Sequence, residues 1–427
     1  MEPTGAANRE NESGRAQGLP EALRGRSVYI ETYGCRYNFG DTAKLVEILR
    51  HYGSMVVEDP DDAEAVIVNT CTVVGPTERR MLRRLSGLRD YDLYVTGCMP
   101  GIQRDAILAV CSPTFISPEI IHDLYRSVGT VATEGIGIVQ IAQGCAGSCT
   151  YCITRFARGP LKSFAEEEIL AQVRAFVRAG SYEIQLTAQD VSAWGMDIGQ
   201  SLPELLESLD KIPGNHRIRV GMMNPATVKG QTGDLIDAFA GDHIFKFIHL
   251  PVQSGSDAIL TLMGRRYTAA EFGEIVRLFR GRYPGITVAT DMIVGFCGET
   301  DVDFSASLDL IRMIKPAKVN VTRYSRRPFT PLAQEKDFPD HVKKGRSRTM
   351  NAVAEEVYAS INASQLGKTV PFMVTETLRK GSVMARSPEY TGIVIRENLP
   401  VGYHGNVILR QDRKYFFIGE HVREICP

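Results

Sequence analysis

The chain has 427 residues, which is long enough for two or three domains with a sizeable core. Its 49 Lys and Arg side chains nearly balance 50 Asp and Glu side chains, and the net charge of -1 excludes wholesale electrostatic coating of nucleic acid. No apolar stretch approaches the roughly 18 residues of a membrane helix, and the polar N-terminus holds no secretory signal. We therefore expect an intracellular, cytoplasmic protein without a membrane anchor.

The N-terminal part of the chain predicts a small α/β domain. Residues 1–26 lack periodic apolar positions and are expected to form a mobile tail. Strands are predicted at 27–32, 65–69 and 92–96, with helices at 41–51 and 76–88 between them. This βαβαβ order predicts a parallel sheet in a domain that spans residues 27–128.

A second region of alternating strands and helices extends over residues 135–364. Its predicted strands lie at 137–142, 183–187, 218–221, 245–250, 287–292 and 318–323. About six β/α units favour an incomplete or complete β/α barrel, with the active site at the C-terminal ends of the strands. In residues 367–427, short β segments separated by Gly, Pro and Asn predict a small all-β barrel of the kind that binds oligonucleotides.

Three cysteines each end one of the first three predicted strands, namely Cys35 in YGC, Cys71 in NTC and Cys98 in TGC. A large intracellular protein does not need disulfides, so metal binding or catalysis is the working interpretation. The carboxyl ends of parallel strands converge, so the three thiols can meet around one metal centre. The alternative is three buried thiols that pack as small apolar side chains. No motif surrounds the remaining cysteines, which are expected to be ordinary thiols: Cys111, Cys297 and Cys426.

A compact C-x3-C-x2-C loop follows the first strand of the second region, with Cys145, Cys149 and Cys152 as its thiols. Such a loop can hold three corners of a cubane iron-sulfur cluster and leave the fourth iron without a protein ligand. The alternative, a structural zinc site, is closed by four Cys or His ligands, and no histidine lies between His122 and His216. The open iron is therefore the chemically useful feature.

This loop, with Tyr151 before its last cysteine, resembles the motif of the radical S-adenosylmethionine (SAM) superfamily. The resemblance implies a 4Fe-4S cluster on Cys145, Cys149 and Cys152 whose open iron binds SAM and cleaves it. Together with the N-terminal cysteines and the terminal barrel, the resemblance extends to the methylthiotransferases along nearly the whole chain. That family carries an auxiliary 4Fe-4S cluster on the N-terminal cysteines, and its terminal barrel is a TRAM domain.

Several segments resemble the archaeal and eukaryotic branch that modifies threonylcarbamoyladenosine in tRNA, among them TYCITRFARGPLKSF at 150–164 and HLPVQSGSD at 249–257. The animal members' C-terminal anchor is not expected here. The resemblance implies conversion of N6-threonylcarbamoyladenosine at position 37 to its 2-methylthio derivative, with two molecules of SAM per turnover, an external electron donor and a sulfur source. The alternatives are an enzyme that acts on isopentenyladenosine in tRNA or on a ribosomal protein, and a noncatalytic iron-sulfur RNA-binding protein.

The resemblance also implies a set of polar residues that line the SAM pocket: Tyr151, Gln189, Asp190, Arg219, Asn224, Gln253 and Ser254. The alternative for each is an ordinary polar residue that ends a strand or caps a helix. A run of basic residues closes the second region, and we expect it to hold the tRNA anticodon arm together with the terminal barrel, although such a run alone usually forms a solvated face. This run comprises Arg323, Arg326, Arg327, Lys343, Lys344, Arg346 and Arg348.

Overall fold

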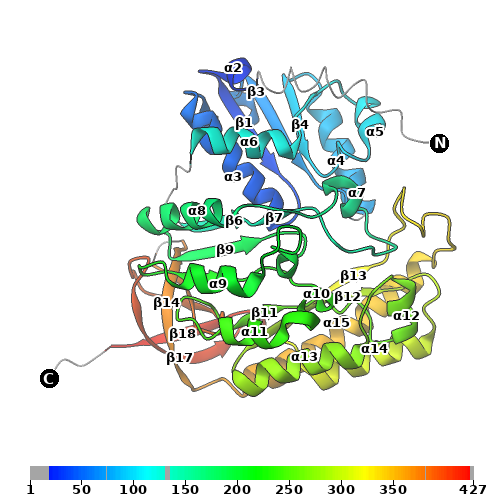
Figure 1. The fold of residues 1–427 in the computed structure, drawn as a ribbon, viewed down its shortest axis with the longest axis vertical. Coiled ribbons are helices and arrows are strands. Elements are labelled where there is room, and N and C mark those ends of the chain that lie inside the picture. Colours follow the sequence, from blue (N-terminus) through cyan, green and yellow to red (C-terminus); the bar gives the residue numbers. More distant parts are fainter. Residues whose placement is uncertain (1–18, 74, 130–134, 380, 424–427) are drawn as a thin grey trace. The chain divides into compact units, whose positions relative to one another are not determined.

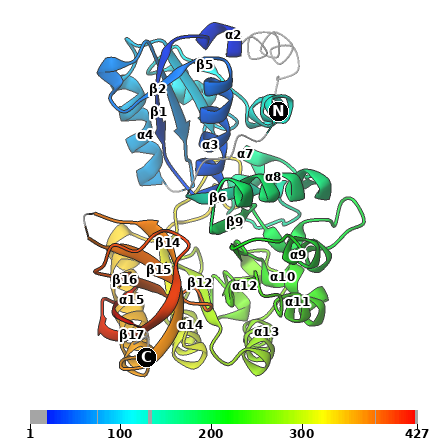
Figure 2. The same ribbon diagram turned by 90° about the vertical axis from the view of Figure 1, so that its left-hand side faces the viewer.

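The computed structural model describes residues 19–73, 75–129, 135–379 and 381–423, in the two compact units visible in Figures 1 and 2. The first unit contains residues 1–131, 152–160 and 327–329, and the second contains the remainder of the chain. Within the described ranges, no helix is both long enough and apolar enough to cross a membrane. Cys426 and most of the predicted tail lie outside the described residues.

The first unit is built on a parallel five-stranded sheet, which confirms the fold expected for the N-terminal region. Its strand order is β2-β1-β3-β4-β5, and the bounds are β1 (Ser27–Thr32), β2 (Met55–Val57), β3 (Ala65–Thr70), β4 (Leu93–Gly97) and β5 (Thr114–Phe115). Every residue of the central β3 is buried, because its AVIVNT sequence offers apolar side chains to both faces.

Helices cover both faces of this sheet. Ala65 and Ile67 of β3 pack in one core cluster with α3 (Arg36–His51) and α6 (Pro118–Val128). The alternate residues Val66 and Val68 pack in a second cluster with α4 (Gly75–Gly87) and α5 (Arg104–Leu108). The period of two along a strand thus divides one apolar segment between two cores.

Two details of this unit differ from the sequence-based expectation. Within the predicted tail, Leu19–Leu23 form helix α2, and the side chains of Leu19 and Leu23 are buried in the cluster that contains α3. The two leucines lie four residues apart and share one helix face, but a single turn is too short for its period to be recognised. Helix α3 also begins at Arg36, directly after Cys35, rather than at Asp41.

The second unit contains six parallel strands in two sheets of three. The first sheet has the order β10-β9-β6 and the second β11-β12-β13; the bounds are β6 (Ile136–Gln140), β9 (Glu183–Thr187), β10 (Arg217–Arg219), β11 (Phe247–His249), β12 (Thr287–Val294) and β13 (Lys318–Arg323). Parallel bridges from Ile218 to Ile244 and from Met222 to His249 join the two sheets. The six strands therefore follow one another in chain order, as in an incomplete β/α barrel.

Helices pack neighbour to neighbour around these strands, and Figure 2 shows most of them in green and yellow. They are α8 (Glu166–Arg178), α9 (Leu202–Asp210), α11 (Thr232–Ala238), α13 (Ala269–Arg282), α14 (Asp301–Ile314) and α15 (Asp340–Ala363). One continuous core of apolar side chains extends from Val139 to Tyr358. The predicted β/α barrel is thus confirmed in its incomplete form.

The C-terminal segment forms a closed five-stranded barrel with the order β14-β15-β16-β18-β17. Its bounds are β14 (Thr369–Thr377), β15 (Val383–Arg386), β16 (Gly392–Ile395), β17 (His404–Asp412) and β18 (Phe417–Val422). Its interior is filled by apolar side chains such as Phe372, Ile393 and Val407. The all-β barrel predicted from the sequence is confirmed.

The turn between β15 and β16 inserts Tyr390 into the β/α part of the same unit. The Tyr390 ring lies 4.9 and 5.1 Å from the rings of Phe245 and Phe247. Its hydroxyl donates to the fully buried Glu183 carboxylate of β9, and Arg386 lies 3.7 Å from the second carboxylate oxygen. Removal of the small barrel would therefore uncover apolar rings and a buried charge.

A buried histidine pair gives this unit a pH dependence. His216 is 2% exposed, and its ring stacks on that of His243 with 4.2 Å between centroids. Burial, followed by the charge on His243, lowers the pKa of His216 from 6.5 to about 4. The neutral ring therefore contributes stability that is complete above the unfolded pKa and is lost as the pH falls from about 6.5 towards about 4.

We expect His216→Phe to remove this pH dependence while keeping a stacked ring. Between pH 7 and pH 4 the original protein should lose about 2–3 kcal/mol more stability than the variant, because only its histidine must become charged in the interior. The measurement is the thermal midpoint of both proteins at half-unit pH steps. Parallel pH curves for the two proteins would contradict the assignment.

Candidate functional site

The three N-terminal cysteines lie at the carboxyl ends of adjacent strands. Cys71 directly follows β3 and Cys98 directly follows β4, whereas Cys35 follows β1 by three residues and caps α3. Cys71 and Cys98 are buried and Cys35 is exposed. The neighbouring glycines permit this close approach: a Cβ on Gly97, at φ 93°, would lie 2.3 Å from the Thr70 carbonyl oxygen.

The same three thiols are close enough to influence one another electrostatically. Burial raises the pKa of Cys98 to about 11, the adjacent Arg158 opposes this, and Cys35 and Cys71 raise the pKa further. Burial and Cys35 likewise raise the pKa of Cys71. The structure thus brings the predicted triad together at one sheet edge.

The three thiols do not form a group that could hold a single metal ion in the described part of the chain, where no three His, Cys, Asp or Glu side chains are arranged to do so. A cubane cluster separates its thiolates more widely than a zinc ion does, since each thiolate binds a different iron. The assignment of an iron-sulfur cluster to Cys35, Cys71 and Cys98 stays a prediction.

An arginine that sequence reasoning missed lies beside these thiols. Arg158 ends α7 (Thr154–Arg158), is buried, and places its Nε 3.4 Å from the Cys98 Sγ. Its Nη2 donates to Asn38 Oδ1 at 2.9 Å and to Asp41 Oδ2 at 2.8 Å. Its buried Nη1 has no hydrogen-bond partner among the described residues. Because buried donors require acceptors, this nitrogen suits a site that binds an anionic group such as the sulfides of a cluster.

The C-x3-C-x2-C loop follows β7 (Ala142–Gln143) in the second unit. Backbone N–H groups shape it: Gly144 donates to Gln189 Oε1 at 2.7 Å, and Gly147 donates to the Cys145 Sγ at 3.2 Å. A Cβ on Gly147 would lie 3.2 Å from the Cys145 sulfur and 3.9 Å from the Cys149 sulfur. Cys145 and Cys149 thus flank one glycine, while Cys152 begins the segment 152–160 that packs in the first unit.

Several residues of the predicted SAM pocket gather on the loops after β9 and β10. The Asp190 carboxylate accepts from the backbone N–H of Asn224 at 3.0 Å and from the Thr227 hydroxyl at 2.9 Å. Burial raises the pKa of Asp190, and these hydrogen bonds oppose the rise. Asp190 and Asn224 also cap short helices, which matches the alternative role considered for them.

Arg265 connects this group to the cysteine loop and was also missed. Its Nη1 donates to Asn224 Oδ1 at 3.3 Å, and its Nη2 donates to the Tyr151 hydroxyl at 3.0 Å. The Tyr151 ring in turn makes an edge contact with Phe296. Arg265 therefore orients the aromatic residue that precedes the last cysteine of the motif.

The other predicted SAM residues make contacts within the protein. Gln253 adopts φ 72°, and its backbone bonds to Asp291 and Ile293 on β12. The Ser254 hydroxyl lies 3.3 Å from that of Ser307. The Arg219 guanidinium lies over the rings of Phe247 and Tyr390, at 4.8 and 5.4 Å from their centroids. Their contact with SAM stays a prediction.

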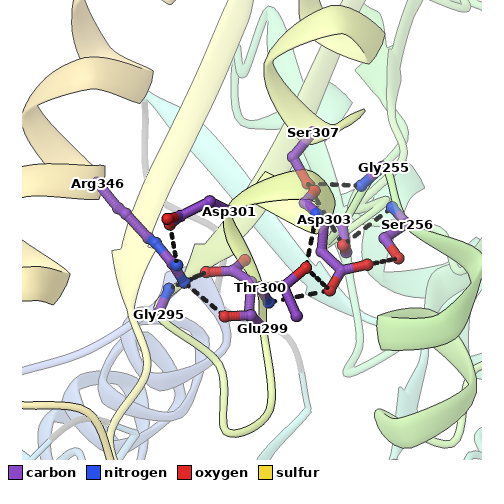
Figure 3. Close-up of polar contacts among 10 residues, drawn as sticks. Gly255, Ser256, Gly295, Glu299, Thr300, Asp301, Asp303, Ser307 and Arg346 are labelled. Carbon is purple, nitrogen blue, oxygen red and sulfur yellow. Dashed lines mark hydrogen bonds and ion pairs between the residues drawn. The ribbon is translucent and has the colours of Figure 1, made fainter. Parts of the chain in front are cut away.

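The turn at residues 295–300 is held by an ion-pair network, drawn in Figure 3. The Arg346 guanidinium donates to Glu299 at 2.6 Å and to Asp301 at 2.8 Å. Glu299 also accepts from the Gly295 N–H at 2.7 Å, so its carboxylate joins the two ends of the turn. Asp303, at the start of α14, accepts from the Ser256 hydroxyl and thereby fixes the loop beside Gln253.

Comparison with known proteins agrees with this geometry. The Radical SAM superfamily matches residues 139–311, and the Uncharacterized protein family UPF0004 matches residues 27–114. The probable threonylcarbamoyladenosine tRNA methylthiotransferase of Pyrococcus abyssi is 40% identical over 405 residues, which cover 88% of this chain and 94% of that protein. The human threonylcarbamoyladenosine tRNA methylthiotransferase is 29% identical over 433 residues, which cover 93% and 74% of the two chains.

The chain belongs to the threonylcarbamoyladenosine tRNA methylthiotransferase family. The resemblance inferred from its motifs is thereby confirmed. Among solved structures, the radical S-adenosylmethionine methyltransferase TsrM from Kitasatospora setae has 15% identity and a TM-score of 0.51, covering 72% of this chain and 77% of that one. At this low identity, the likeness shows only that the two chains share a fold.

In this methylthiotransferase the predicted basic patch is divided between buried and exposed positions. Arg327 is buried, pairs with Glu78 and donates to the Thr72 hydroxyl. Lys343 is also buried and pairs with Asp337 at 2.8 Å. Arg326 and Lys344 are exposed, and Arg323 is half-buried. Arg346 of the same run is buried as well, so the seven basic residues do not form one exposed patch.

We expect Arg346→Ala to destabilise the methylthiotransferase by about 3–5 kcal/mol, because the nearly inaccessible Glu299 carboxylate loses its ionic partner. The measurement is the shift in thermal or denaturant midpoint. The control is Arg312→Ala, which removes an exposed pair with Asp309 on α14 and should change stability by less than about 1 kcal/mol. Equal effects of the two substitutions would contradict the role given to the Glu299 pair.

Proposed function

We propose that the protein converts N6-threonylcarbamoyladenosine at position 37 of tRNA to its 2-methylthio derivative by radical SAM chemistry. The observation that carries this proposal is the 40% identity, over 88% of the chain, to the probable threonylcarbamoyladenosine tRNA methylthiotransferase of Pyrococcus abyssi. The two groups of cysteines supply a second line of support, since each can leave one iron of a cluster open.

Cys145, Cys149 and Cys152 would hold the SAM-cleaving cluster, and Cys35, Cys71 and Cys98 the auxiliary cluster. When bound, the two clusters and SAM supply the electron, the carbon-centred radical and the methylthio group that the unreactive C2 of adenine requires. The task of the chain is to position and shield these groups. Gln189 fixes the start of the cysteine loop through the Gly144 N–H.

A second structural support for this assignment is the polar framework beside the loop. Arg265 holds the Tyr151 hydroxyl and the Asn224 side chain together. Asp190 holds the Asn224 backbone, so the residues proposed for the SAM pocket are preorganised before any ligand binds. The proposal still includes contact of SAM with four of these residues: Asn224, Gln253, Ser254 and Arg219.

The partner is proposed to be the anticodon loop of a tRNA, whose unpaired bases can be splayed and stacked. The terminal barrel, here assigned as a TRAM domain, and the exposed Arg326 and Lys344 would hold the anticodon arm. An external electron donor and a sulfur source complete the reaction, and a cytoplasmic location stays a prediction. The names of the similar proteins favour threonylcarbamoyladenosine over isopentenyladenosine or a ribosomal protein as the substrate.

We expect substitutions in the two cysteine groups to block different steps of the reaction. Cys149→Ala should abolish formation of 5′-deoxyadenosine, whereas Cys71→Ala should retain it but yield no methylthio product. Each variant should lower the iron content from about eight to about four per chain. The measurements are iron analysis, 5′-deoxyadenosine assay with dithionite and SAM, and mass spectrometry of tRNA nucleosides from cells with and without the gene. A methylthio nucleoside unchanged by gene loss would contradict the proposed function.

We expect Arg326→Gln and Lys344→Gln to weaken tRNA binding without altering cluster content, because both side chains are exposed cations. Each should reduce the slope of log affinity against log salt by about 1, as expected for one lost phosphate contact. The control is Arg277→Gln on α13, an exposed arginine paired with Glu274. Unchanged affinity in both test variants would remove this segment from the RNA interface.

A further inference from the structure

Arg158 is fixed on one side by helix α3 of the first unit. Its side chain is fully buried, and Nη2 contacts both Asn38 and Asp41 of α3. The guanidinium also lies 4.8 Å from the centroid of the Tyr37 ring. These contacts use one nitrogen and one face of the group, so its position is determined by α3 rather than by sulfur.

The remaining two nitrogens have no oxygen partner in the described part of the protein. Nε lies 3.4 Å from the Cys98 Sγ, and the buried Nη1 has no hydrogen-bond partner there. An arginine retained only for an ion pair would place its other N–H groups on carbonyl oxygens or in water. This guanidinium instead presents a hydrogen bond and a positive charge to the sulfur of a proposed cluster ligand.

We propose that Arg158 is a positioning residue for the auxiliary cluster and raises the reduction potential of that cluster. The inference rests on the proposed function, since it requires a cluster on Cys35, Cys71 and Cys98. Hydrogen bonds to cluster sulfurs withdraw electron density, and a buried cation stabilises the more negative, reduced state. Both effects favour reduction.

Arg158 also lies close in the sequence to Cys152, a proposed ligand of the SAM-cleaving cluster. The residue follows Cys152 by six positions, and the segment 152–160 packs in the first unit. Gly101 approaches the same segment, because a Cβ there would lie 3.4 Å from the Ala157 carbonyl oxygen. One short segment thus begins with Cys152, a proposed ligand of the SAM-cleaving cluster. Near its other end, Arg158 contacts Cys98, a proposed ligand of the auxiliary cluster.

The experiment uses the full-length chain with Cys145, Cys149 and Cys152 replaced by Ala, so that only the auxiliary cluster is loaded. In this background we compare Arg158 with Arg158→Gln by redox titration followed by electron paramagnetic resonance. Loss of the charged donor should shift the reduced-to-oxidised ratio at a fixed potential about tenfold towards the oxidised form. For one electron this corresponds to about 59 mV. The matched control is Arg155→Gln on the same helix, whose guanidinium lies over Phe156, and its potential should not change.

A fully loaded Arg158→Gln variant with an unchanged potential would overturn the inference. If that variant does not retain iron, the Arg158→Lys variant tests the inference in its place. Lysine keeps the positive charge but lacks the planar Nε donor. The reduction potential of this variant should therefore fall below that of the parent, by less than the fall expected for Arg158→Gln. A lysine variant with the original potential also overturns the inference. A parent chain that binds no cluster contradicts the proposed function itself, and iron analysis distinguishes this result from the others.

Discussion

The carboxyl ends of parallel strands converge at one edge of a sheet, and both proposed cluster sites depend on this constraint. In the first unit it brings together Cys35, Cys71 and Cys98, which are separated by up to 63 positions in the sequence. In the second unit it gathers the segments after β6, β9 and β10, which carry the cysteine loop, Asp190 and Asn224. A parallel sheet needs helical crossovers, so residues that meet in space are necessarily far apart in the chain.

Buried or half-buried arginines hold the loops that this topology brings together. Arg158 joins α7 to α3, Arg265 joins Tyr151 to Asn224, and Arg346 closes the turn around Glu299. A loop has few apolar contacts, so a planar side chain with five donors can define its geometry where hydrophobic packing cannot. The desolvation of such charges is expensive, which makes each of these contacts depend on its partner.

The parts of the fold that could be predicted are those that have a local signal. Continuous apolar segments such as AVIVN predicted buried parallel strands. The position of three cysteines after these strands predicted one group of thiols, and the C-x3-C-x2-C spacing predicted the other. The short β2 and β5 and the start of α3 were missed, because two or three residues show no period. Arg158 and Arg265 carry no motif. In the sequence, Arg327 and Lys343 resemble part of a solvated run of charges. The partner of Arg327 is Glu78, which precedes it by 249 positions, so no local pattern could reveal the pair.

The small terminal barrel packs against the β/α part of its unit. Tyr390 lies against Phe245 and Phe247 and bonds to Glu183 at the start of β9. Arg219, proposed for the SAM pocket, stacks over this same tyrosine. A displacement of the β15–β16 turn must therefore disturb the Arg219 guanidinium, since close-packed interiors transmit small movements instead of absorbing them. Tyr390 thus couples the barrel with the β/α core, together with the Arg386–Glu183 pair and the hydrogen bond from the Lys246 N–H to the Pro388 carbonyl.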